Sequence, residues 1–328
     1  MLRKFFVIAL LISLLAACAP QATPTAAPVV TEVPATQPPP TQAPTETAAV
    51  STTLTLTDGL GREVKLSGPA QRVISMAPSN TEILFAIGAG DQVVGRDALS
   101  DFPEEAKSLT DIGSTFDALN TEQIVSLKPD LVLAAEINTP EQVKQLEDLG
   151  LTVYYLKNPL TLEELYGNLE IVAQLTGHQD ETATLIESLK ARVAAVDEKI
   201  APISSRPNVF YELDATDPAK PYTAGKGTFI TQLIERAGGH NIAADIDGYP
   251  QLSLEQVVAA DPSFIILGDA AYGITPESIA SRPGWENLSA VKNNQVFAFD
   301  DNLVSRPGPR LVDALEQLAK LLRPELFQ

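Results

Sequence analysis

The sequence predicts an α/β protein made of two similar lobes that are joined by one long helix. The helix is expected over residues 180–200, where apolar residues recur at spacings of three and four, the period of one face of an α-helix. The segments 120–133 and 253–266, one on each side of this helix, both read polar-x-Glu-Gln-apolar-apolar-x-x-x-Pro-x-apolar-apolar. Each segment predicts a short helix followed by a strand, so part of the first lobe is repeated in the second.

The chain begins with a segment that is typical of an export signal. Arg3 and Lys4 precede an apolar run over residues 5–15, which is shorter than the roughly 20 residues that span a bilayer. The run ends in Leu15-Ala16-Ala17-Cys18, which resembles a bacterial lipobox. This resemblance implies that residues 1–17 are a signal peptide and that Cys18 carries a lipid anchor. A plain secretory signal with an incidental cysteine is the alternative.

Composition separates the rest of the chain into a tether and a folded part. Residues 18–52 are rich in Pro, Thr and Ala, so they lack the apolar content that ordering requires and predict an extended tether. The formal charge of −19 becomes −21 when the two positive charges of residues 1–17 are removed, which argues against nucleic acid and anionic lipid as partners. With the only cysteine at the anchor, we expect no internal disulfide.

The first lobe, residues 53–179, is predicted to hold a parallel sheet that is covered by helices. Alternating apolar residues around Asp58-Gly59-Leu60-Gly61 predict a β-hairpin at the edge of the lobe. After the hairpin, short apolar runs alternate with helical segments, which is the pattern of a parallel sheet with both faces covered. The strands are expected at residues 72–76, 93–95, 131–134 and 153–155, and the helices at residues 82–87, 121–127 and 140–149.

Capping residues mark the helix ends in this lobe. Ser79 and Thr161 each precede a glutamate by three residues, the spacing of a capping box, and Glu82 is the partner expected for Ser79. Gly177 is expected to end the helix that Thr161 begins. Gly88-Ala89-Gly90 follows a helix instead of separating a strand from a helix, so it predicts a helix C-cap rather than a dinucleotide-binding loop.

The bridging helix is assigned residues 180–203 and the second lobe residues 204–328. Strands in the second lobe are expected at residues 209–211, 264–267 and 296–299, and helices at residues 229–236, 254–260 and 311–322. Polar loops that carry aromatic or charged side chains lie at residues 221–227, 248–250 and 300–310. Ligands of open α/β sheets bind beyond the strand ends, so the sequence predicts a ligand cleft between the lobes.

Neither a metal site nor a catalytic site is predicted. His178 and His240 are the only histidines, and neither has the spacing of a metal ligand; His240 is expected in a helix-end turn. The sequence has no nucleophile elbow and no P-loop, and Ser75, Ser79 and Ser253 fit strand or cap positions. We therefore expect a protein that is not an enzyme and has no intrinsic cofactor. A cell-surface hydrolase or an adhesion module is the alternative.

Four motifs connect the sequence with a known family. In chain order they are Arg72-Val73-Ile74-Ser75-Met76-Ala77-Pro78-Ser79-Asn80-Thr81-Glu82, Leu127-Lys128-Pro129-Asp130-Leu131-Val132, Thr223-Ala224-Gly225-Lys226 and Ala237-Gly238-Gly239-His240-Asn241-Ile242. Together they resemble the class III substrate-binding proteins of ABC importers for vitamin B12, iron-siderophores and haem, and the resemblance covers nearly all of residues 53–322. It implies two Rossmann-like lobes bridged by a single long α-helix, little hinge closure, and capture of a chelate for delivery to a permease dimer with its ATPase subunits.

Within this family the chain is most similar to the cobalamin-binding members. The resemblance implies that side chains of both lobes contact the ligand: Ser79, Leu99, Phe116, Tyr222, Tyr249, Asp301 and Arg306. Phe116, Tyr222 and Tyr249 are expected to face one another across the cleft and to cover the macrocycle, and Asp301 and Arg306 resemble a polar pair. A ferric siderophore or haem is the alternative ligand, for which the arginines available to an anionic chelate are Arg96, Arg282 and Arg306.

Glu122 and Glu255 occupy equivalent positions of the repeated segment, in the first helical turn after Asn120 and Ser253. A carboxylate there interacts favourably with the helix dipole, by roughly 0.3–1 kcal/mol. The resemblance implies a second role, in which the two glutamates meet arginines of a two-fold symmetric permease. The expected protein is a monomer that is anchored by lipid outside the cytoplasmic membrane.

Overall fold

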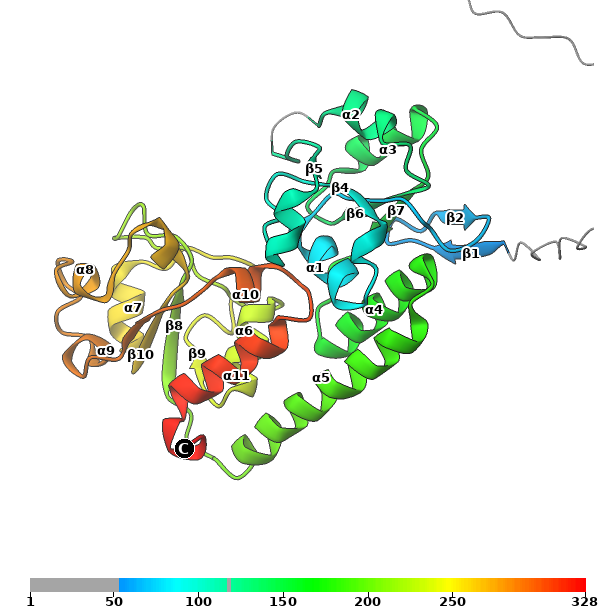
Figure 1. Cartoon of the computed structure of the whole chain (residues 1–328). Coiled ribbons are helices and arrows are strands. Elements are labelled where there is room, and N and C mark those ends of the chain that lie inside the picture. Colours follow the sequence, from blue (N-terminus) through cyan, green and yellow to red (C-terminus); the bar gives the residue numbers. More distant parts are fainter. Residues whose placement is uncertain (1–52, 117–118) are drawn as a thin grey trace, which may run out of the picture. The chain divides into compact units, whose positions relative to one another are not determined.

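The computed structural model describes residues 53–116 and 119–328, and Figure 1 shows two groups of strands and helices that one long helix connects. The predicted signal peptide, Cys18 and the tether lie outside the described residues. The described part begins with the predicted antiparallel hairpin, formed by β1 (Leu54–Thr57) and β2 (Glu63–Leu66). In the described ranges, no helix has the length and apolar character that crossing a membrane requires.

The N-terminal lobe is built on a parallel sheet of five strands in the order β5-β4-β3-β6-β7. The strands are β3 (Val73–Ser75), β4 (Val93–Arg96), β5 (Thr110–Asp111), β6 (Leu131–Ala135) and β7 (Val153–Leu156). The helices are α1 (Pro78–Ala86), α2 (Thr121–Ser126), α3 (Pro140–Asp148) and α4 (Leu162–Thr176), with single turns η1 (Gly90–Gln92) and η2 (Glu104–Ser108). Every residue of β6 is buried, as expected for a central strand with both faces covered.

The C-terminal lobe is built on a parallel sheet of four strands in the order β11-β10-β8-β9. The strands are β8 (Asn208–Glu212), β9 (His240–Asn241), β10 (Phe264–Leu267) and β11 (Val296–Ala298). The helices are α6 (Phe229–Arg236), α7 (Leu254–Ala260), α8 (Pro276–Ala280), α9 (Ser289–Lys292), α10 (Asn302–Ser305) and α11 (Leu311–Leu322), with single turns η3 (Gly268–Tyr272) and η4 (Pro324–Leu326).

The repeated segment has the same place in both sheets. In the N-terminal lobe, Leu131 pairs with Val73 of β3, and Val132 pairs with Val153 of β7. In the C-terminal lobe, the equivalent Phe264 pairs with Val209 of β8, and Ile265 pairs with Val296 of β11. The two lobes therefore share strand order and register around β6 and β10, so positions in one lobe can be matched to positions in the other.

The long helix α5 (Gln179–Ile200) packs against helices of both lobes. Its buried apolar face contains Ile186, Leu189, Val193, Val196 and Ile200, which lie within the stretch of recurring apolar residues and join a core cluster shared with α4 and α11. Burying side chains of this size contributes about 1.5–3 kcal/mol each. On the C-terminal side, ion pairs reinforce the contact: Arg192 binds Asp313 at 2.5 Å and Glu316 at 2.9 Å, and Arg236 binds Asp197 at 2.6 Å.

Three local predictions need correction. The helix expected at residues 82–87 begins earlier, at Pro78, whose missing N–H fits the first helical turn; its N-cap is Ala77, so the Ser79 capping box is wrong. Thr161 does cap α4, but the Glu164 carboxylate accepts a hydrogen bond from the Leu160 N–H instead of completing a box. His240 lies in β9 rather than in a helix-end turn.

Candidate functional site

A cavity of about 620 Å³ lies between the two lobes, at the carboxyl ends of β3 and β6. Its N-terminal wall includes Ser79, Leu99, Ala135, Glu136, Ile137 and Asn158. Its C-terminal wall consists of Tyr249, Tyr272, Asn302, Ser305, Arg306 and Pro307. The volume is within the range of small-molecule sites, and the position is the one expected for a ligand of an open parallel sheet.

Four of the seven predicted ligand residues line this cavity. Ser79 is buried in the first turn of α1, and Leu99 follows β4 with 44% of its surface exposed. Tyr249 is 62% exposed on the opposite wall, and Arg306 directly follows α10. The fold thus brings residues from distant parts of the chain to one cavity, while their contact with a ligand stays a prediction.

The other three predicted residues lie outside the cavity lining. Phe116 is 70% exposed, and Tyr222 forms isolated bridges with Asp214 and Gln251. Asp301 accepts a hydrogen bond of 2.9 Å from the Tyr211 hydroxyl, and burial raises the pKa of Asp301. Of the three aromatic residues expected to face one another, only Tyr249 lines the cavity.

Sequence reasoning missed several residues of the lining. Tyr272 is 88% exposed and ends η3, a single turn that no periodic pattern marks. Glu136 and Ile137 directly follow the carboxyl end of β6, a strand that the sequence predicts. This position could have identified them as lining residues, because ligands of open parallel sheets bind beyond the strand ends. Asn158 likewise follows β7.

Arginines of the C-terminal lobe bind carboxylates of the N-terminal lobe beside the cavity. Arg310 donates to both carboxylate oxygens of Glu82, at 2.8 and 2.5 Å, and Glu82 is only 3% exposed. Arg306 lies 2.5 Å from Asp101 and 3.4 Å from Glu82. Burial is the largest single influence on Asp101 and opposes its ionisation, but the hydrogen bond and the positive charge of Arg306, with smaller contributions from the backbone and Lys107, together lower the pKa of Asp101.

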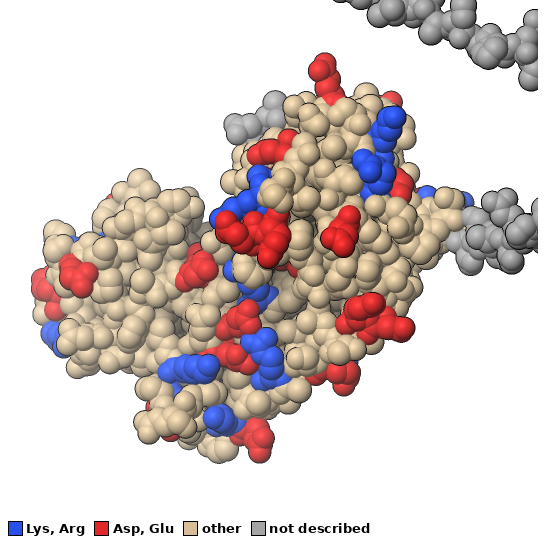
Figure 2. Space-filling model, viewed as in Figure 1, with Lys and Arg blue, Asp and Glu red and all other residues tan. Residues whose placement is uncertain are grey.

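These ion pairs form a second connection between the lobes, separate from α5. Charge-assisted and partly bidentate hydrogen bonds are among the stronger polar contacts in proteins. The guanidinium of Arg310 also lies 4.1 Å from the centre of the Phe102 ring, a cation–π contact. Figure 2 shows acidic and basic side chains gathered along the boundary between the lobes. We call Glu82, Asp101, Arg306 and Arg310 the interlobe seam.

Each arginine considered for an anionic chelate already binds a carboxylate. Arg96 lies 3.2 Å from Asp111, and Arg306 belongs to the interlobe seam. Arg282 is buried and donates to both oxygens of Glu212, at 2.6 and 2.7 Å, so it is enclosed within the C-terminal lobe. Arg306 is the only cationic residue in the described lining of the cavity, and its charge is compensated.

The two glutamates predicted for docking are exposed, one in each lobe. Glu122 is in the first turn of α2, where Asn120 accepts a hydrogen bond from the Gln123 N–H. Glu255 is in the first turn of α7, where Ser253 and Gln256 form a capping box. Within residues 53–116 and 119–328, neither glutamate forms an ion pair, and no cluster of three or more His, Cys, Asp or Glu side chains is placed to hold a metal ion.

The chain matches a known protein family over most of its length. Residues 73–303 match the periplasmic binding protein family. The chain is 34% identical over 280 residues to the uncharacterized ABC transporter substrate-binding lipoprotein YvrC of Bacillus subtilis, covering 84% of this chain and 87% of the relative. It is also 34% identical over 263 residues to the vitamin B12-binding protein of Vibrio cholerae, covering 78% and 90%.

A solved structure shares the fold. The periplasmic haem-binding protein RhuT of Roseiflexus sp. RS-1 superimposes with a TM-score of 0.70 and 30% sequence identity, over 78% of this chain and 99% of that chain. The family match and these relatives identify a substrate-binding component of an ABC importer, which works with a permease and an ATPase and is not an enzyme. The chain belongs to the periplasmic binding protein family.

Proposed function

We propose that this protein is a lipoprotein that captures cobalamin in the interlobe cavity and delivers it to the permease of an ABC importer. The lining of the cavity is the observation that supports cobalamin as the ligand. Tyr249 and Tyr272 face a wall that includes Leu99, Ala135 and Ile137, while Arg306 is paired with Asp101. Such a surface favours a large, flat ligand without net negative charge at its edge.

The aromatic and aliphatic walls supply most of the expected binding free energy. Tyrosine rings offer a large apolar area with little conformational freedom to lose, and ring faces pack well against a flat macrocycle. The vitamin B12-binding protein of Vibrio cholerae, at 34% identity, supports a corrinoid as the ligand.

Haem and ferric siderophores are the alternative ligands. Haem is included in the calorimetric test below because the structural neighbour RhuT is a haem-binding protein. An acidic chelate would need a cation in the cavity. Arg306 could supply one only by giving up its 2.5 Å contact with Asp101, which would leave that carboxylate without its main partner. This exchange disfavours a carboxylate-bearing ligand relative to a neutral one.

Docking to the permease is assigned to Glu122 and Glu255. The two carboxylates are exposed, they occupy equivalent positions of the two lobes, and they are free to meet cations of a two-fold symmetric partner. Charges arranged in this way set orientation and association rate more than affinity. Cys18 is assigned to the lipid anchor, which would hold a monomer at the outer face of the cytoplasmic membrane.

Calorimetric titration with cyanocobalamin and with haemin tests the choice of ligand. We expect cyanocobalamin to bind more tightly, and Tyr249→Ala to weaken it by about 1–3 kcal/mol, the scale of burying one large side chain. Tyr222→Ala is the matched control, because Tyr222 lies outside the cavity lining and a loss as large would place it in contact with the ligand. Tighter binding of haemin would reject the corrinoid assignment.

A further inference from the structure

A second cavity, of about 510 Å³, lies within the C-terminal lobe at the carboxyl ends of β8 and β10. The loop after β8 contributes Leu213, Asp214, Ala215 and Thr216, and the segment after β10 contributes Asp269, Tyr272 and Ile274. Tyr272 lines both this cavity and the interlobe cavity, so the two are neighbours. We call the second cavity the Asp269 pocket.

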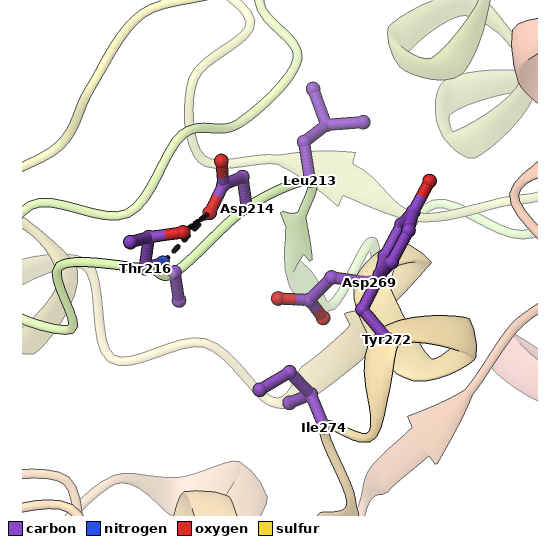
Figure 3. A pocket seen from close by; sticks show the side chains of 7 residues that line it. Leu213, Asp214, Thr216, Asp269, Tyr272 and Ile274 are labelled. Atoms are coloured by element: carbon purple, nitrogen blue, oxygen red, sulfur yellow. Dashed lines mark hydrogen bonds between the residues drawn. The ribbon is translucent and has the colours of Figure 1, made fainter.

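The Asp269 pocket holds a buried carboxylate that accepts no hydrogen bond from the described residues. Asp269 is 4% exposed, and no described group donates a hydrogen bond to either of its oxygens. Figure 3 shows this carboxylate directed into the space between the loop of Asp214 and Thr216 and the segment of Ile274. Leaving a buried polar group unpaired is unfavourable, and native proteins rarely keep one without a functional reason.

The charges around the pocket make it selective for hydrogen-bond donors. Arg282 is occupied by its two hydrogen bonds to Glu212, so these two charges compensate each other and ionised Asp269 leaves one negative charge in excess. Asp214, at the rim, accepts two hydrogen bonds of 2.7 Å from Thr216 and adds another negative charge. Burial raises the pKa of Asp269 to about 7, and both the negative charge of Glu212 and a hydrogen bond between the two carboxyl groups add to the increase, so the ionised form of Asp269 is the one that lacks a donor. Within the described residues, no cationic side chain lines the pocket.

We infer that the Asp269 pocket is a subsite that receives a nitrogen-bearing arm, a primary amide or an ammonium group, of the chelate held between the lobes. The inference rests on the proposed function, because the arm must reach the pocket from the interlobe cavity past Tyr272. An N–H donor would satisfy the unpaired oxygens of Asp269. A carboxylate arm would instead add a like charge beside Asp269 and Asp214, so the pocket would reject chelates with acidic edges.

The test is calorimetric titration of three probes that differ in their arms. Cyanocobalamin carries primary amides, the ferric hydroxamate ferrioxamine B carries an ammonium group, and haemin carries carboxylates. Asp269→Asn keeps the size of the side chain but replaces a charged acceptor with a neutral one. We expect the amide- or ammonium-bearing probe that binds to lose about tenfold in affinity, the difference between charged and neutral hydrogen bonds.

Asp245→Asn is the control, since it removes the same charge from an exposed position of the same lobe; its affinity should stay within about twofold of wild type. Chemical unfolding of the ligand-free protein separates binding from folding. If Asp269 serves only the fold, Asp269→Asn lowers the unfolding midpoint. If it serves a ligand, the midpoint stays the same or rises.

The outcomes separate the inference from the proposed function. Cyanocobalamin binding that depends on Asp269 supports both. Cyanocobalamin binding that is unchanged in Asp269→Asn overturns the subsite and keeps the function. Ferrioxamine B binding that depends on Asp269, with no binding of cyanocobalamin, keeps the subsite and overturns cobalamin as the ligand. Tightest binding of haemin, or no binding of any probe, overturns both.

Discussion

Glu136 and Asp269 occupy equivalent positions in the two lobes, because continuing the register of the repeat past β6 and β10 brings one opposite the other. Glu136 is exposed, lines the interlobe cavity and accepts a hydrogen bond of 3.2 Å from the Asn158 N–H. Asp269 is buried and has no protein donor among the described residues. The same topology therefore presents a solvated, paired carboxylate in one lobe and an enclosed, unpaired one in the other.

The surroundings of the two carboxylates explain the difference. The position equivalent to Glu212, at the end of β8, is Met76 in the N-terminal lobe, so the C-terminal lobe has an additional acid next to Asp269. The nearby cation Arg282 pairs with Glu212 and lies 5.0 Å from the centre of the Trp285 ring. The repeat therefore determines where the two carboxylates lie, whereas neighbours that are not part of the repeat determine whether each carboxylate is paired.

The largest expected effect comes from removing Arg282. Arg282→Met leaves Glu212, which is fully buried, next to Asp269 without a compensating cation. Breaking a buried pair by removing one partner costs about 3–5 kcal/mol, so denaturant unfolding should show a loss of that size.

The double variant Arg282→Met with Glu212→Met makes this part of the C-terminal lobe resemble the N-terminal lobe, where Met76 stands at the equivalent position. We expect it to recover most of the lost stability, since apolar replacement of both partners is often neutral. A double variant as unstable as the single one would show that packing, not the unpaired charge, causes the loss.

A smaller effect is expected at the interlobe seam, where the N-terminal lobe supplies the acids and the C-terminal lobe the arginines. Arg310→Met removes two hydrogen bonds to Glu82 and leaves Arg306 at 3.4 Å. We expect a loss of about 2 kcal/mol in the free energy of unfolding. Hydrogen exchange should accelerate around residues 99–103, while β6 and β10 stay protected.

Lys144→Met is the control for the seam, because the Lys144 pair with Asp148 is exposed and lies within α3. It should leave the unfolding midpoint and the exchange pattern unchanged. Equal exchange in Arg310→Met and wild type would mean that α5 alone holds the lobes together.

A pH titration compares the two equivalent carboxylates directly. The pKa of Asp269 is about 7 in the folded protein against an ordinary value of 3.8, so between these values the folded state binds more protons than the unfolded state. This contribution is fully present below pH 3.8 and is lost as the pH rises towards 7, by at most about 1.4 kcal/mol per pH unit. Glu212 and Arg282 are the charged side chains that act on Asp269 there.

Asp269→Asn should remove this slope, so the variant gains stability relative to wild type as the pH rises from 4 to 7. Glu136→Gln is the matched control at the equivalent position and should keep the slope of the wild-type curve. If urea unfolding gives parallel curves for Asp269→Asn and wild type, the burial of Asp269 does not control its protonation.

The sequence predicted the parts of the fold that depend on local pattern. The bounds of α6, α7, α11 and β10 agree with those expected, because each is a periodic or uninterrupted apolar run. The two-residue strand β9 and the four-residue helix α10 were missed, since such short segments show no period.

The candidate site was only partly predictable, because local sequence pattern does not show which distant residues pair in the folded protein. Ser79, Leu99, Tyr249 and Arg306 were identified through the family resemblance, and they line the cavity. The pairing of Arg306 with Asp101, like that of Arg282 with Glu212, joins residues far apart in the chain and follows from tertiary packing alone. Sequence pattern therefore located charged residues, but could not tell which of them are free to bind a ligand.

The smallest effect on stability is expected at Glu122 and Glu255, which have the same environment in the two lobes. Both are exposed in the first turn of a capped helix, so replacing each with Gln removes only a helix-dipole interaction of roughly 0.3–1 kcal/mol. If they also dock the permease, Glu122→Gln with Glu255→Gln should sharply reduce uptake by the reconstituted importer, while calorimetric ligand affinity stays unchanged. Glu141→Gln is the control, since Glu141 is an exposed acid in the first turn of α3 outside the repeat. Normal uptake in the double variant, or loss of ligand binding, would contradict docking and leave helix electrostatics as the sole role of both residues.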